Sequence, residues 1–141
     1  APDVIITSGL GSCVGVVVYD CEKKIAGLSH VLLPDSSVAK KADLKLYKYA
    51  ETAIPILIEK LIQMGARKSA LKAKMAGGAQ MFQFPEASSV MRIGPRNVDA
   101  VKEQLHKFHI PLDASDVGGN LGRTIVVEQE TCKLNVRKAN K

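Results

Sequence analysis

The chain has 141 residues, 46% of them hydrophobic and 4% aromatic, and its 20 Lys and Arg against 14 Asp and Glu give a formal net charge of +6. This length fits a single domain over residues 1–141, and no apolar segment approaches the ~20 residues that cross a bilayer. The absence of a secretory signal favours the cytoplasm, and the absence of Trp and of any nucleic-acid-binding motif favours an acidic protein partner over nucleic acid.

The first predicted strands flank a glycine-containing segment. Residues 4–6 are β-branched, and residues 14–19 include three consecutive valines. Gly11 lets the backbone between these strands approach other groups closely, and Ser12 adds a second small residue before Cys13. A thiol at the start of a strand, beside backbone amides that can face a reacting carbonyl group, is a candidate nucleophile.

A histidine on the next predicted strand supplies a candidate base. Residues 25–33 form an apolar run that contains His30, and an antiparallel pairing with the preceding strand would set its imidazole beside Cys13. Only the thiolate attacks well, and a nearby imidazole both lowers the pKa of the thiol and carries its proton. The alternative is a structural cysteine, because cysteine is among the most buried residue types. The residues alone leave both interpretations open.

A long amphipathic helix is predicted over residues 47–64. Its apolar positions recur at steps of three and four residues and comprise Ala50, Ile54, Leu57, Leu61 and Met64. Gly65 is typical of a helix end, and Pro55 predicts either a kink or a start near Thr52. The polar segment before this helix, as far as Leu44, is predicted to be a surface loop.

A second predicted helix follows a pair of glycines. Residues 70–76 alternate apolar side chains with lysines, which indicates a half-buried strand, and they run into Gly77 and Gly78. These glycines mark tight packing or the wall of a pocket. Residues 93–97 contain a proline that suits the first turn of a helix, whose apolar stripe comprises Val98, Val101, Leu105 and Phe108.

The last third of the chain is predicted to be mostly strand. Residues 110–114, 124–128 and 133–137 have the composition of strands. The loop between the first two is either an ordinary turn or part of a substrate groove in which Asn120 and Arg123 donate hydrogen bonds. The prediction for the whole chain is an α+β fold built in layers, with mostly antiparallel strands and two principal helices.

Other sequence features exclude several kinds of site. Cys13, Cys21 and Cys132 are an odd number of cysteines without CxxC spacing, which predicts reduced thiols, no disulfide framework and no zinc site. The motifs of P-loop nucleotide hydrolases, α/β-hydrolases and HExxH zinc proteases are absent. We therefore expect neither a metal nor a cofactor, and Cys13 with His30 is the strongest candidate site.

An ordered set of motifs covers nearly the whole chain and comprises Thr7 and residues 10–16, 30–34, 48–50, 53–54, 77–79, 81–82, 93–94, 96–97, 116–120 and 122–123. This set resembles the family of chemoreceptor glutamine deamidases called CheD. The resemblance implies a chemotaxis enzyme that converts glutamines on receptor signalling helices to glutamate with release of ammonia, and that also hydrolyses glutamyl methyl esters. It further implies a fold similar to that of bacterial deamidating toxins, which carry a cysteine and a histidine on adjacent strands.

The resemblance also implies roles for particular residues. The catalytic cysteine of the family falls on Cys13, its histidine on His30 and its third catalytic position on Thr7, which would orient the imidazole. A thioester on the cysteine would be the intermediate, without a cofactor. The implied partners are the receptors, through which alone the protein meets a membrane, and the phosphatase CheC. Further candidate pocket residues are Gly11, Ser12, Gly78, Asn120 and Arg123.

Two other functions remain compatible with the sequence. The protein would be mainly a binding partner and regulator of CheC if the thiol site were only a docking surface. A cysteine peptidase would use the same nucleophile and base to cut the main chain. Release of ammonia from an intact receptor separates the deamidase from both, because a binding module releases none and a peptidase leaves fragments.

Overall fold

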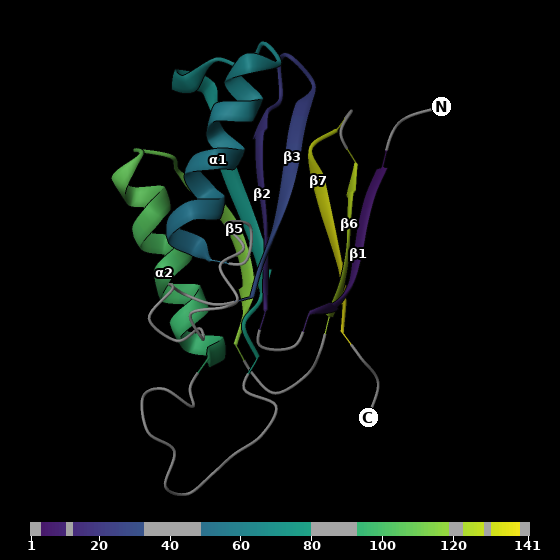
Figure 1. The fold of residues 1–141 in the computed structure, drawn as a ribbon. Helices are drawn as coiled ribbons and strands as arrows, with labels where there is room; N and C mark the ends of the chain where they lie inside the picture. Colours follow the sequence, from purple (N-terminus) through teal and green to yellow (C-terminus); the bar gives the residue numbers. More distant parts are fainter. Residues whose placement is uncertain are drawn as a thin grey trace, which may run out of the picture.

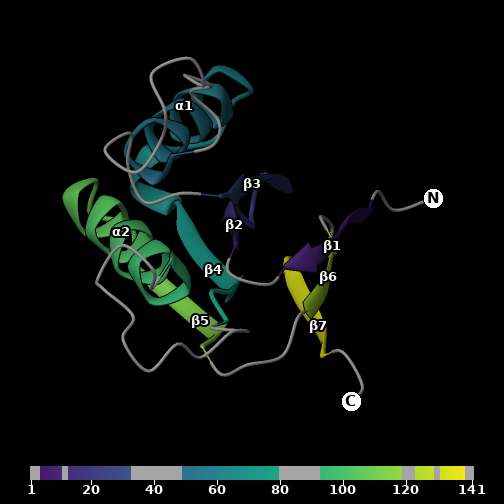
Figure 2. The same ribbon diagram turned by 60° about the horizontal axis from the view of Figure 1, so that its bottom comes forward.

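A computed structural model of the protein describes residues 4–10, 13–32, 49–79, 93–118, 123–128 and 131–138. Within these ranges the fold has three layers: two helices, a four-stranded sheet and a three-stranded sheet (Figure 1, Figure 2). The helices are α1 (Ala50–Gln63) and α2 (Ile93–Lys107), and a short 3-10 turn, η3 (Lys68–Ala70), follows α1. The strands are β1 (Val4–Leu10), β2 (Val14–Asp20), β3 (Ile25–Val31), β4 (Lys72–Gly77), β5 (Leu112–Val117), β6 (Arg123–Glu128) and β7 (Lys133–Lys138).

The two sheets differ in how their strands are connected. The four-stranded sheet has the order β3-β2-β4-β5, and the three-stranded sheet has the order β1-β6-β7. All described pairings are antiparallel except that of β4 with β5. This parallel pair is joined through α2, because parallel neighbours need a crossover connection. The predicted α+β fold with mostly antiparallel strands and two principal helices is confirmed.

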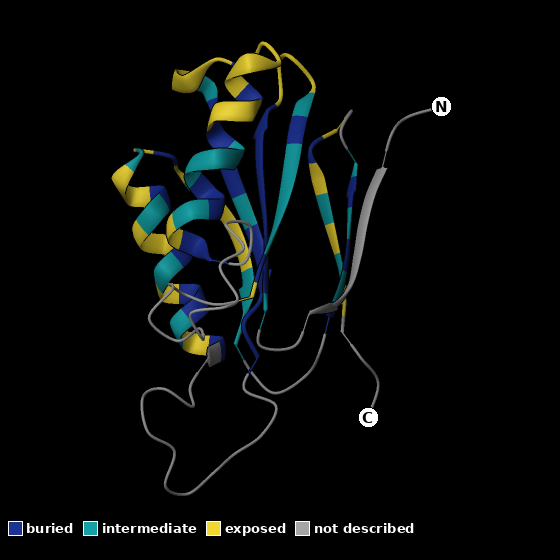
Figure 3. Ribbon diagram, in the orientation of Figure 1, coloured by how far each residue is buried: buried dark blue, intermediate teal, exposed yellow. Residues whose placement is uncertain are grey.

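Strand β2 is the centre of the core, because it is covered on both faces. Val14, Val16 and Val18 point to one face and pack with α1 and α2, whereas Val17 and Tyr19 point to the other and pack with the three-stranded sheet. Every residue of β2 is buried, as the dark blue strand in Figure 3 shows. Burial on both faces explains why β2 is a continuous apolar run and does not alternate with polar residues.

Helix α1 differs in detail from the sequence prediction. It begins at Ala50, not near Thr52, and continues through Pro55. Met64 was expected on the apolar face but is 65% exposed, because the helix ends at Gln63 and the chain turns away at Gly65, whose φ is +110°. The residues of α1 that are buried are Ala50, Ala53, Ile54, Ile58 and Leu61. No helix in the described ranges is long and apolar enough to cross a membrane.

The end of α2 sets where β5 begins. The predicted stripe of this helix is confirmed, with Val98, Val101 and Leu105 buried and Phe108 packed against them. His109 adopts a left-handed conformation, and the amide of Ile110 donates to the carbonyl of Leu105 at 2.9 Å. This bond closes the helix end, so the strand predicted over residues 110–114 starts later, at Leu112. The predicted loop before α1 lies outside the described residues.

Candidate active site

His30 lies in β3, and Cys13 immediately precedes β2, the antiparallel neighbour of β3. In the pairing of β2 with β3, Gly15 is directly opposite His30. Cys13 comes two residues before Gly15, and alternate residues of a strand share a face. Cys13 and His30 are therefore diagonal neighbours on one face of the sheet, a relationship in which Cβ atoms lie roughly 7 Å apart and long or aromatic side chains meet. Gly15 places no side chain between them.

The face that carries this pair is the one between the two sheets. Cys13 packs against Ala76 of β4 and Ile125 of β6, which form a small buried cluster. Leu28, which shares its face of β3 with His30, packs against the same cluster. Both Cys13 and His30 are half-buried. The thiol and the imidazole thus lie on the face at the junction of the layers, where surrounding apolar groups limit their contact with water.

Burial keeps both groups in their neutral forms. It raises the pKa of the Cys13 thiol, while the backbone amide of Cys13 partly offsets this by lowering the pKa. It lowers the pKa of the His30 imidazole. The Nε2 atom of His30 is buried and has no hydrogen-bond partner among the residues that the structure describes. A buried nitrogen of this kind can take a proton from a thiol or give one to a leaving group.

A glycine turn fixes the backbone of Cys13. The amide of Gly78 donates to the carbonyl of Cys13 at 2.8 Å. Gly77 has a φ of +114°, and a Cβ there would come within 2.2 Å of the same carbonyl oxygen. A Cβ on Gly78 would come within 2.3 Å of Val98 on α2. The turn therefore needs glycine at both positions, which agrees with the tight packing expected from the sequence.

Arg123 supports this turn from below the surface. Its side chain is only 3% exposed. Its Nη1 donates to the carbonyl of Gly77 at 3.2 Å, and its Nη2 donates to the carbonyl of Gly118 at 2.9 Å and to Asp116 Oδ1 at 3.4 Å. The sequence suggested Arg123 as a donor to substrate in a loop, but it lies in β6 and its guanidinium binds backbone carbonyls. These contacts connect Arg123 to Cys13 through the glycine turn.

Asn97 is a supporting residue that the sequence analysis did not single out. Its side chain is buried in the first half of α2, and its Nδ2 donates to the carbonyl of Leu32 at 3.0 Å. Leu32 follows the end of β3, two residues after His30. The bond therefore attaches the end of the histidine strand to the helix layer. Two signals in the sequence pointed to it: its place in the motif at residues 96–97, and its position as a polar residue beside the apolar stripe of a predicted helix.

The other predicted site residues are only partly described. Thr7 is paired with Ile125 in the antiparallel contact of β1 with β6, and the register shifts between Thr7 and Leu10. Since Ile125 packs with Cys13, this pairing brings β1 to the same junction. Gly11, Ser12 and Asn120 lie outside the described residues.

A pocket in the described part of the chain lies at the opposite end of β2 from Cys13. It has a volume of about 330 Å³, and its lining includes Asp20, Cys21 and Cys132. The described residues include no group of three or more His, Cys, Asp and Glu side chains that could hold a metal ion. Cys13 and His30 combine a thiol with an imidazole, so they are the candidate site for acyl transfer.

Comparison with known proteins gives consistent matches. A family profile described as "CheD chemotactic sensory transduction" matches residues 32–138. The chain is 57% identical over 136 residues to "Chemoreceptor glutamine deamidase CheD" of Bacillus subtilis, covering 96% of the chain and 82% of the relative. It is 58% identical over 139 residues to "Probable chemoreceptor glutamine deamidase CheD" of Oceanobacillus iheyensis, covering 99% and 84%. A relative in Clostridium botulinum with the same "probable" name is 53% identical over 136 residues.

The two kinds of match differ in what they cover. The family profile begins at residue 32, after Cys13 and His30. The alignment with the Oceanobacillus protein extends over 139 of the 141 residues and so includes both positions. The similarity is therefore not restricted to the helices and the second half of the chain, but includes the strands that carry the candidate thiol and imidazole.

Proposed function

The chain belongs to the CheD family, and we propose that it is a chemoreceptor glutamine deamidase with Cys13 as the nucleophile and His30 as the base. The names of the relatives suggest the reaction. The observation that carries the proposal is the strand register, which sets Cys13 diagonally from His30 on the face between the sheets. In this proposal the 141 residues are one catalytic domain that acts in the cytoplasm on glutamines of receptor signalling helices.

The first half of the proposed reaction forms a thioester. The neutral imidazole of His30 takes the proton of the Cys13 thiol, and the sulfur attacks the carbon of the glutamine carboxamide. The carbonyl oxygen becomes an oxyanion. In this proposal the backbone amide of Cys13 donates to that oxygen. The imidazolium then protonates the nitrogen as the C–N bond breaks, so ammonia leaves.

The second half releases glutamate. Neutral His30 takes a proton from water, the hydroxide attacks the thioester carbon, and the sulfur of Cys13 leaves and recovers the proton. A glutamyl methyl ester would give the same thioester with loss of methanol, so ester hydrolysis needs no additional residues. The protonation states favoured by burial suit this scheme, because the free site holds a neutral thiol beside a neutral base.

Supporting residues fall into two groups in this proposal. Thr7 orients the imidazole, while Gly11, Ser12 and Asn120 line the pocket that receives the glutamine. Gly78 and Arg123 act indirectly, because their hydrogen bonds hold the backbone of the nucleophile or the turn beneath it. No step of the proposed reaction requires a cofactor.

We also propose that the protein binds the phosphatase CheC, and that CheC competes with the receptor because both cover the same site. The formal net charge of +6 supports recognition of acidic partners in general. A protein that bound CheC without deamidating receptors would be a regulator and not an enzyme. The experiment below separates these two functions.

The test uses the whole chain and a receptor cytoplasmic fragment, with intact mass and released ammonia read together. We expect an amide-to-acid mass change with an equal amount of ammonia, lost in Cys13→Ala and His30→Ala. Cys21→Ala is the matched control, because it removes an exposed thiol at the other end of β2 and should retain turnover. Undiminished deamidation by Cys13→Ala would refute the assignment of the nucleophile. Absence of turnover in the folded wild type, with CheC still bound, would favour the regulator.

A further inference from the structure

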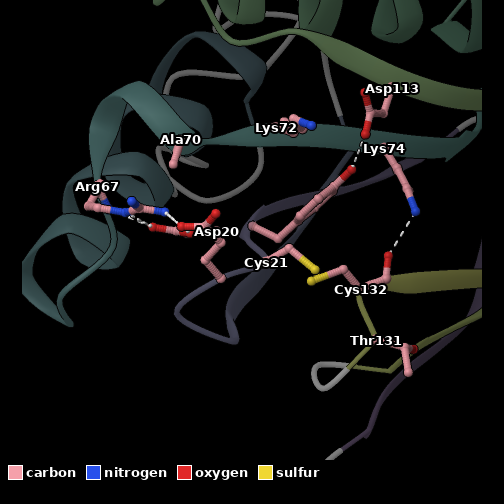
Figure 4. A pocket seen from close by; sticks show the side chains of 11 residues that line it. Asp20, Cys21, Arg67, Ala70, Lys72, Lys74, Asp113, Thr131 and Cys132 are labelled. Carbon is pink, nitrogen blue, oxygen red and sulfur yellow. Dashed lines mark hydrogen bonds and ion pairs between the residues drawn. The ribbon is translucent and has the colours of Figure 1, made fainter.

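Two thiols outside the proposed active site face each other. Cys21 begins the turn after β2, and Cys132 lies in the turn before β7. Since β2 and β7 are in different sheets, the two cysteines lie in turns of different sheets. Figure 4 shows the sulfur atoms of Cys21 and Cys132 pointing toward one another. The sequence predicted no disulfide, because nothing in the spacing of the three cysteines brings these two together.

The two cysteines differ in how accessible they are. Cys21 is exposed, whereas Cys132 is only 4% exposed and packs with Val17 and Tyr19 of β2. Burial and the neighbouring thiol both raise the pKa of Cys132, so it keeps its proton. Both line the pocket of about 330 Å³ described above. A small reagent entering this pocket therefore meets Cys21 first, with Cys132 held immediately behind it.

Several contacts hold the turn of Cys132 against the other sheet. Lys74 of β4 donates from Nζ to the carbonyl of Cys132 at 2.8 Å, and its ammonium lies 5.3 Å from the centre of the Tyr19 ring. Tyr19 in turn donates to Asp113 Oδ2 at 2.6 Å. Cys132 has a φ of +60°, a left-handed conformation that most residues avoid. The turn of Cys132 is thus held by contacts from β2 and β4 that do not depend on Cys21, and Asp113 of β5 in turn holds Tyr19.

We propose that Cys21 and Cys132 are a redox-sensitive pair that forms a reversible disulfide, with hydroperoxides as the oxidant. This inference does not rest on the proposed deamidase function, because it uses neither Cys13 nor His30. The proposed disulfide joins the two sheets covalently at one end of β2. Cys13, at the other end, keeps its thiol.

The chemistry balances with one molecule of hydrogen peroxide. The sulfur of Cys21 attacks one peroxide oxygen, the O–O bond breaks, and the thiol proton leaves with the second oxygen as water. Cys21 is then a sulfenic acid. The sulfur of Cys132 attacks it, the S–O bond breaks, and the hydroxide leaves with the proton of Cys132 as a second water. Two thiols are oxidised, one peroxide is reduced, and a dithiol reagent reverses the reaction.

The link is expected to stabilise the fold. At this end the sheets are held by apolar contacts among Val17, Tyr19, Ala26 and Val127. A disulfide between Cys21 and Cys132 closes a loop of more than a hundred residues in the unfolded chain, which reduces its conformational freedom. We expect the Tm of the oxidised protein to rise by roughly 5 to 10 °C.

The experiment treats the full chain with one equivalent of hydrogen peroxide, blocks remaining thiols with iodoacetamide in denaturant, and maps the peptides by mass. We expect a Cys21–Cys132 cross-linked peptide, one alkylated cysteine at Cys13, and a higher Tm that dithiothreitol reverses. Cys21→Ser, a change at an exposed position, should abolish both the cross-link and the shift. Cys13→Ala should retain both.

Three results would overturn the proposal. The first is oxidation of Cys21 to a sulfinic acid or to an intermolecular dimer while Cys132 remains alkylatable. The second is oxidation of Cys13 before the pair. The third is a cross-link that leaves the Tm unchanged, which would refute the link between the sheets as a stabilising device. All readouts are independent of receptor deamidation, so failure here and failure of the proposed function are distinguishable.

Discussion

The amide of Gly78 donates a 2.8 Å hydrogen bond to the carbonyl oxygen of Cys13, so a glycine turn holds the backbone of the candidate nucleophile in place. The adjacent Gly77 pairs with Val14 at the start of β2 and approaches the same carbonyl too closely to carry a side chain. Substitutions in this turn should therefore alter the candidate active site without replacing a side chain that takes part in the proposed reaction.

Gly77→Ala should damage both stability and reactivity. The new Cβ would lie 2.2 Å from the carbonyl oxygen of Cys13, at a φ of +114° that disfavours alanine. We expect the free energy of unfolding to fall by more than about 2 kcal/mol, measured in urea, and alkylation of Cys13 to change in rate. Gly118→Ala is the matched control, because its φ is +83° but nothing lies within 4 Å of the added carbon. It should lose only about 1 kcal/mol. Equal losses in the two variants would contradict the proposed close approach.

Arg123→Lys should show that Arg123 positions the site and does not bind substrate. Lysine keeps the charge but cannot reach the carbonyls of Gly77 and Gly118 together as the guanidinium does. We expect a loss of about 2–4 kcal/mol in the free energy of unfolding, because the carbonyls of Gly77 and Gly118 both lose their bonds to the buried guanidinium, although Gly77 keeps the amide of Gly118 as a donor. In kinetics with a receptor fragment, kcat should fall and KM should stay constant. The exposed Arg137→Lys should change neither. A higher KM at unchanged kcat would instead indicate that Arg123 binds substrate.

The pH dependence of Cys13 should reflect a neutral thiol and a neutral imidazole. Because burial raises the pKa of Cys13 above its ordinary 9.0, alkylation by iodoacetamide should still be increasing with pH at pH 9.0. Because burial lowers the pKa of His30 below 6.5, the acid limb of kcat/KM should lie below pH 6.5. Cys21→Ser removes the exposed thiol that would obscure the labelling. Alkylation that is constant with pH below 9.0 would instead indicate a preformed thiolate and imidazolium pair.

Asp20→Asn should remove an acid-sensitive part of the stability. Asp20 is fully buried and accepts hydrogen bonds from the amide, Nε and Nη2 of Arg67, which hold the pKa of its carboxyl well below the usual range. Its folded pKa is lower than its unfolded value of 3.8, so it stabilises the fold above that pH and this contribution is lost as the pH falls further.

The measurement is the Tm of Asp20→Asn against the wild type over the acid range. The variant should melt at a lower temperature near neutral pH, and the difference should shrink progressively below pH 3.8. Glu22→Gln is the control, because Glu22 also binds Arg67 but its side chain is 81% exposed, so its Tm should change little. A difference that did not depend on pH would mean that the carboxylate charge is unimportant.

Much of the fold was predictable because the signals are local. Each of these signals indicates the burial or the backbone geometry of the residues that carry it: the continuous apolar run of β2, the apolar stripe of α2, and the glycines at 77 and 78. The antiparallel pairing of β2 with β3 was also expected, since the strands are close in sequence. The errors occurred at the ends of elements, such as Met64 beyond α1, because turn geometry and not periodicity determines where a helix ends.

The sequence by itself determined the fold class, the two principal helices and the choice of Cys13 and His30 as candidates, because those follow from residue type and short spacing. Only the tertiary structure decided that Arg123 is buried beneath the glycine turn and that Cys21 meets Cys132. These contacts join residues that are distant in sequence. They depend on how the two sheets pack on each other, and that packing is set by many apolar contacts together, so no single motif records it.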